Sequence, residues 1–136
     1  MDLPRRRRTV AMSSQGLSDT VAVFLRDHIR TVDDLCLLVA VAAAPDRWWD
    51  EASVAAELLI DSAGARALLE HLAAHNLLEI RVTDDIRYRF HPGMVTLRSG
   101  ALACAAAFRD KPGAVWRAVA GSAGRRSAAI PAPSGQ

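Results

Sequence analysis

The chain has 136 residues, of which 51% are hydrophobic, 24% charged and 5% aromatic, and its formal net charge is +2. This length fits one domain, and this apolar fraction is enough for a core, so disorder of the whole chain is excluded. The longest apolar run, 35–45, is too short to span a bilayer, and the segment after the basic start is too polar for a signal peptide. We therefore expect a cytoplasmic protein with no membrane association.

The net charge conceals an uneven distribution of acidic and basic residues. Six of the 17 basic residues lie near the two ends, and four of these are the run Arg5, Arg6, Arg7 and Arg8. Between Thr9 and Gly124 there are 11 basic and 14 acidic residues, which is a net charge of −3. Basic residues are in excess only in the second half of this segment, which should attract phosphate weakly.

The N-terminal third is predicted to contain an arm and two helices. Residues 1–17 show no apolar periodicity and include four consecutive arginines, so we expect a disordered basic arm. A helix is predicted over 18–30, with Ser18 as its N-cap. A second helix is predicted over Val32 to Ala44, opened by a capping box at Thr31 to Asp34. This helix is apolar on almost all sides, which is typical of a central helix.

Two shorter helices are predicted to follow. An extended link carries Trp48 and Trp49, one of which should pack inward. Asp50 caps a short amphipathic helix, and Asp61 caps a longer one that ends at Asn76 in the left-handed conformation.

A β-hairpin is predicted next, from the alternation of apolar and polar residues in 77–82 and 86–90. The apolar side chains of both strands share one face. The residues predicted to point to solvent are Arg81, Arg87, Arg89 and His91.

Helices over 94–109 and 114–120 are predicted to complete a single domain over 18–120. Residues 121–136 are rich in Gly, Ser, Ala and Pro, and we expect a disordered tail. The predicted fold class is mainly α with a small β-hairpin (α+β).

Several residue groups within Val32 to Pro92 carry a likeness to a known architecture. They are Leu35, Leu38 and Val39, then Trp48-Trp49, then 53–58, then Ala65, Leu68, Leu69 and Leu72, then Asn76-Leu77-Leu78 and Tyr88-Arg89-Phe90. In this order they resemble the winged helix-turn-helix of bacterial transcriptional regulators. The resemblance implies binding to duplex DNA, with the third helix of the motif in the major groove and the hairpin against the backbone.

The resemblance also indicates which residues would contact DNA. The base-reading positions fall at the exposed start of the helix after Asp61, on Ser62, Ala63, Arg66 and Glu70, and only Arg66 can make a bidentate contact with guanine. The hairpin corresponds to the wing of this architecture, and its arginines Arg81, Arg87 and Arg89 are called the wing arginines below. They can bind phosphates or enter a minor groove, although the negative charges of Asp84 and Asp85 at the tip of the hairpin oppose this. The predicted DNA-binding residues are Ser62, Arg66, Arg81, Arg87, Arg89, Arg5, Arg6, Arg7 and Arg8.

Other interpretations of these arginines stay open. The wing arginines are also explained as solvated residues that block sheet-to-sheet association. The run Arg5 to Arg8 is either a groove-following arm, a solvated tail, or a segment upstream of a later start at Met12.

Two kinds of partner are considered. The flanking helices, Asp19 to Arg30 and Met94 to Arg109, carry more apolar surface than one small core absorbs, so we expect a homodimer that sets the spacing of DNA half-sites. The alternative is a non-catalytic protein-interaction module that docks a partner through the acidic first half or the Trp48-Trp49 edge. The net charge of −3 and the sparsely polar third helix favour this alternative.

An enzyme, a cofactor and a metal site are not expected. The sequence has no Gly-rich phosphate loop or nucleophile elbow, and the adjacent carboxylates of Asp33-Asp34 and Asp84-Asp85 diverge. His71 and His75 have a spacing that can bind zinc, but nothing nearby completes the site with known spacing, so we interpret them as a solvated helix face. Cys36 and Cys104 are interpreted as small buried hydrophobes.

Overall fold

The structure is a computed structural model, and it describes residues 17–129, with side chains up to Gly121. Within this range the chain is mainly helical with one two-stranded antiparallel sheet, which confirms the predicted fold class. In chain order the elements are α1 (Asp19–His28), α2 (Val32–Ala43), α3 (Glu51–Leu58), α4 (Ser62–Ala74), β1 (Leu78–Val82), β2 (Ile86–Phe90), α5 (Val95–Asp110) and α6 (Pro112–Ala129).

The first four helices begin where side chains cap free backbone N–H groups. Ser18 accepts from the N–H of Val21 at 3.2 Å, and Asp61 accepts from that of Gly64 at 2.7 Å. Capping boxes start α2 and α3, with Thr31 and Asp50 as the N-cap residues. These local contacts confirm the predicted helix starts, because each satisfies a donor that the helix itself leaves unpaired.

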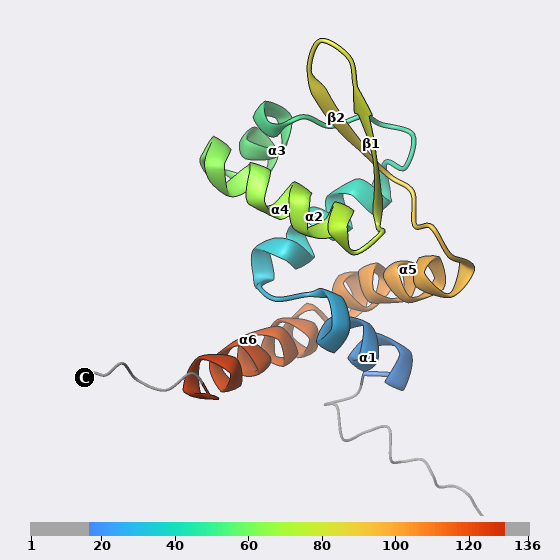
Figure 1. Cartoon of the computed structure of the whole chain (residues 1–136). Helices are drawn as coiled ribbons and strands as arrows, with labels where there is room; N and C mark the ends of the chain where they lie inside the picture. Colours follow the sequence, from blue (N-terminus) through green and yellow to red (C-terminus); the bar gives the residue numbers. More distant parts are fainter. Residues whose placement is uncertain (1–16, 130–136) are drawn as a thin grey trace, which may run out of the picture.

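The helix α2 lies at the centre of the molecule, as predicted from its apolar sequence. Its side chains Leu35, Leu37, Leu38 and Val41 are fully buried, and it contacts α3, α4, α5, α6 and β2. In Figure 1, α3, α4 and the hairpin lie on one side of α2, and α1, α5 and α6 lie on the other. The helix α2, which its apolar sequence predicts to be central, therefore connects the two halves of the fold.

A tight turn connects α3 to α4. Leu59 ends α3 in the left-handed conformation, with φ 59°, and its side chain is exposed. The two helices pack against each other. The order from α2 to β2 is compatible with a winged helix.

The hairpin pairs Leu78 with Phe90 at its base and Val82 with Ile86 near its tip. Trp49 forms a single bridge to Tyr88 on the other edge of β2, with N···O distances of 2.7 and 2.8 Å. Trp49 is buried and Trp48 is partly exposed, so the prediction of one inward tryptophan is confirmed.

The two ends differ from the prediction. The prediction places Leu17 in the disordered arm, but this residue is buried in the core. The rest of the predicted arm, residues 1–16, lies outside the described residues. The helix α6 starts at Pro112 and continues to Ala129, instead of covering only 114–120. Proline is favoured at the first position of a helix, and alanine and arginine offset the glycines beyond 120. The predicted tail is therefore wrong for 121–129, and 130–136 lie outside the described residues.

None of the helices in residues 17–129 is long and apolar enough to cross a membrane.

Candidate nucleic-acid interface

The exposed start of α4 is the first part of the predicted interface. Ser62, Ala63, Arg66 and Ala67 are exposed, whereas Ala65, Leu68 and Leu69 on the opposite side of the helix are buried. Arg66 donates from Nε to a carboxylate oxygen of Glu51 on α3 at 2.7 Å. The only base-reading arginine of this helix is therefore held by an acidic residue of the neighbouring helix.

The wing arginines occupy the outer face of the hairpin. Because side chains alternate across a strand, Arg81, Arg87 and Arg89 point away from the face on which Tyr88 and Phe90 are buried. Their predicted outward orientation is confirmed, but this face is the opposite one from that packed on the helices. The three wing arginines therefore share one face of the hairpin, whereas Arg66 lies on α4 and is paired with Glu51 on α3.

Two of the three wing arginines have carboxylate partners. Arg87 donates to Asp85 at 3.1 Å, and Arg89 donates from Nε to Glu79 across the hairpin at 2.8 Å. Arg81 has none: within the described residues, no carboxylate lies within ion-pair distance of its guanidinium. Arg81 is therefore the wing residue whose charge is most available to an anion.

Trp48 organises the outer face of the wing. The guanidinium carbons of Arg81 and Arg89 lie 4.3 and 4.5 Å from the centre of its ring. Such contacts contribute about 0.5–1 kcal/mol each at an exposed site. The link before α3 thus places the ring of Trp48 beside two arginine side chains of the hairpin. These contacts explain why Trp48, unlike Trp49, is left partly exposed.

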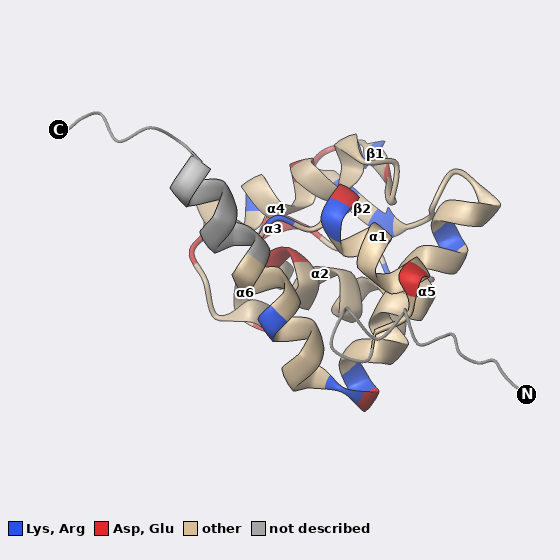
Figure 2. Cartoon of the chain, turned by 90° about the horizontal axis from the view of Figure 1, so that it is seen from below, with Lys and Arg blue, Asp and Glu red and all other residues tan. Residues whose placement is uncertain are grey.

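The local charge balance is acidic. Residues 46–91 contain five arginines and nine aspartates or glutamates, which is a net charge of −4 with neutral histidines. Figure 2 shows basic and acidic residues interspersed along the ribbon. Electrostatic attraction to phosphate must therefore come from individual side chains. The remaining predicted contacts, Arg5, Arg6, Arg7 and Arg8, lie outside the described residues.

A histidine cluster at the junction of α1, α2 and α4 was not predicted. The Nδ1 atoms of His28 and His75 lie 2.8 Å apart, and Nε2 of His71 lies 2.8 Å from the backbone oxygen of His28. The side chain of His71 is only 10% exposed and lies 3.6 Å from the carboxylate of Asp34. The interpretation of His71 and His75 as a solvated face is therefore wrong.

A buried carboxylate supports this cluster. Asp34 is fully buried and accepts hydrogen bonds from the backbone N–H groups of Arg30 and Thr31 and from the side chain of Arg30. Burial lowers the pKa of His28 and His75, and the neighbouring His71 lowers both further. The spacing of His71 and His75 was a visible signal, but the approach of His28 depends on tertiary packing. Among the described residues, no group of three or more His, Cys, Asp or Glu side chains is arranged so that it could hold a metal ion.

Comparison with known proteins finds no matching family model, no matching curated protein and no matching solved structure. The function is therefore inferred from the residues of this chain.

Proposed function

We propose that this chain is a winged-helix protein of the cytoplasm that binds duplex DNA and regulates transcription. The observation that carries the proposal is the exposed start of α4, packed on α3 beside a projecting hairpin whose Arg81 has no carboxylate partner among residues 17–129. A helix fits the major groove, and an adjacent wing fits the backbone. Ser62 and Arg66 would face base edges, and Arg81 would bind phosphate.

The ion pairs of the arginines do not oppose this proposal energetically. The pair of Arg66 with Glu51 is exposed, and exposed pairs contribute about 0–1 kcal/mol. A bidentate contact between arginine and guanine contributes about 1–3 kcal/mol of discrimination. Arg66 would therefore lose little by exchanging its partner at a correct site. The same exchange is open to Arg87, whose partner Asp85 is also exposed.

A homodimer is part of the proposal. Leu102 on α5 and Trp116 on α6 are large apolar side chains exposed on the flanking helices. Pairing these helices across a two-fold axis would cover them and place two copies of α4 at a fixed spacing. Sedimentation of a monomer at micromolar concentration would remove the dimer from the proposal and leave the DNA contact to single chains.

A second candidate function is docking of a protein partner. The observation that favours it is the inner face of the wing beyond the core, where Ile80, Val82 and Ile86 are 52%, 70% and 50% exposed. Val82 and Ile86 are cross-strand neighbours, so this apolar surface is continuous. Residues 46–91, which include this surface, carry a net charge of −4, so the surface would suit an apolar partner with a basic rim.

A gel shift on mixed genomic fragments distinguishes the two functions. The full chain and a chain that starts at Met12 are compared at low and moderate salt. Sequence-selective shifts by both chains are expected if the winged unit binds DNA. A shift that requires residues 1–11 would assign binding to the arginine run, and the absence of any shift would favour protein docking.

A further inference from the structure

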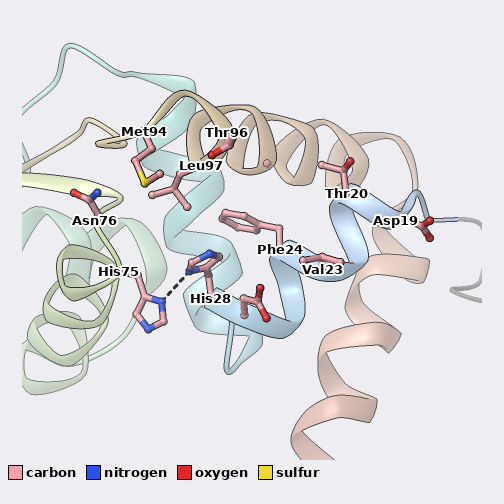
Figure 3. A pocket seen from close by; sticks show the side chains of 12 residues that line it. Asp19, Thr20, Val23, Phe24, His28, His75, Asn76, Met94, Thr96 and Leu97 are labelled. Carbon is pink, nitrogen blue, oxygen red and sulfur yellow. Dashed lines mark hydrogen bonds between the residues drawn. The ribbon is translucent and has the colours of Figure 1, made fainter.

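A groove lies between α1, the start of α5 and the turn from α4 to β1, away from the exposed side of α4 (Figure 3). Its volume is about 640 Å³, which falls within the range of small-molecule sites, about 300–1,000 Å³. Phe24 and Leu97 lie along it, with Val23 and Met94 at its rim. The groove is therefore large enough for one small organic molecule with an apolar body.

The groove is built by elements that pack firmly on each other. Phe24 is buried where α1 meets α5, and a Cβ added to Gly100 would lie 3.0 Å from its ring. Because Gly100 has no side chain, α1 can approach α5 closely at this point. This close contact forms the floor of the groove. Val23 and Met94 are 44% and 60% exposed, so the rim offers apolar surface that no described part of the chain covers. A ligand would bury this surface without a rearrangement of the core.

The charge of the lining is entirely negative. Asp19 and Asp27 are its charged residues, and no lysine or arginine lines the groove. His28 and His75 also line it, but burial lowers the pKa of both, which favours the neutral form of each ring. Asp27 follows Val23 by one helical turn and so shares its side of α1. Within the part of the chain that the structure describes, its carboxylate is bound only by the exposed Arg26 next to it.

We propose that this groove binds a small lipophilic cation, with aromatic or alkyl groups on Phe24, Leu97 and Met94 and the positive charge beside Asp27. A quaternary ammonium or phosphonium ion has this chemistry. The ring of Phe24 adds a further attraction for a cation that lies over it. This site lies away from the exposed start of α4 and from the wing, so it stands or falls independently of DNA binding.

Calorimetric titration with two matched ions tests the proposal. Tetraphenylphosphonium and tetraphenylborate have the same shape and opposite charges. The full chain should bind one phosphonium ion, at least about tenfold more tightly than the borate, because a neighbouring carboxylate favours the cation. The net charge of +2 would by itself favour the borate, so the reverse preference must arise locally. Equal binding, or tighter binding of the borate, would overturn the proposal.

Three variants locate the site. Val23→Trp fills the groove from its rim and should weaken phosphonium binding by at least about tenfold, while Asp27→Asn should reduce the preference for phosphonium over borate. Leu59→Trp makes a similar change at an exposed position in the turn between α3 and α4, outside the groove, and should leave both affinities unchanged. Thermal unfolding of each variant confirms that it is folded.

Two further outcomes count against the site. Phosphonium affinity that is unaltered by Val23→Trp, or reduced equally by Leu59→Trp, would show that binding occurs elsewhere. Affinity that falls as protein concentration rises would identify a second copy of the chain as the occupant of the groove.

Discussion

The Nδ1 atoms of His28 and His75 lie 2.8 Å apart, which joins the end of α1 to the end of α4 (Figure 3). At this distance one ring donates a hydrogen and the other accepts it. If both rings were charged, two N–H groups would face each other and the bond would be lost. The contact between a flanking helix and the proposed DNA-binding helix therefore requires at least one neutral imidazole.

This pair should make the protein less stable in mild acid. Burial lowers the pKa of both imidazoles below the ordinary value of 6.5, so below about pH 6.5 the unfolded chain binds more protons than the native chain. The free energy of unfolding should be level above pH 6.5 and fall as the pH is lowered to 5. Urea unfolding at a series of pH values measures this decline.

The charged groups around the pair contribute in both directions. Asp27 raises the pKa of His28, and Asp34 raises that of His75, whereas His71 and Arg30 lower the pKa of His75. The double variant His28→Asn, His75→Gln should show a shallower decline than the wild type between pH 7 and 5. The control His91→Gln changes an exposed histidine and should keep the wild-type decline. An unchanged decline in the double variant would show that the pair is not responsible.

The two cysteines should differ in reactivity. Burial raises the pKa of the Cys104 thiol to about 12, so almost no thiolate forms at pH 8. Cys36 is only partly buried, and its pKa is raised by burial and by Asp33. In the native protein a thiol reagent should modify Cys36 slowly and Cys104 only after unfolding. Modification of both thiols at one rate in the native state would contradict the burial of Cys104.

Leu72 tests the packing of α4 on the core. Its side chain is fully buried, so Leu72→Ala should lower the free energy of unfolding by about 2–5 kcal/mol. Leu59→Ala removes the same atoms from an exposed position in the turn between α3 and α4 and should change stability much less. Urea unfolding compares the two, and similar losses would mean that α4 does not pack as described.

The fold was largely predictable because its signals are local. The capping residues Ser18, Thr31, Asp50 and Asp61 each lie within three residues of the donor they satisfy, and the alternation in the hairpin is read along one strand. The end of α6 was missed because beyond 120 the glycines and the helix-favouring residues nearly balance.

The candidate site was less predictable because its contacts join distant residues. Arg66 and Glu51 are 15 positions apart, and His28 and His75 are 47 apart. No periodic pattern in the sequence predicts contacts between residues so far apart. The sequence therefore identified the arginines of the wing and α4, but not the carboxylates that neutralise most of them.

Glu51 offers a sharp test of the role of Arg66. Glu51→Gln removes the carboxylate that binds Arg66 and one negative charge beside α4. If α4 reads DNA, this variant should bind a selected duplex more tightly, and Arg66→Ala should relax sequence preference at one base pair. Glu57→Gln, on the same helix and also exposed, is the matched control for the loss of one charge. Equal effects of the two glutamates would show that only net charge matters.

The salt dependence of duplex binding tests the central claim most directly. Fluorescence anisotropy with a selected duplex, recorded from about 50 to 200 mM salt, measures how many phosphates the protein neutralises. We predict that affinity falls steeply with salt, and that Arg81→Ala reduces the slope of log affinity against log salt by about 1. Duplex binding that is absent, or present but insensitive to salt and to Arg81→Ala, would contradict a DNA-binding winged helix.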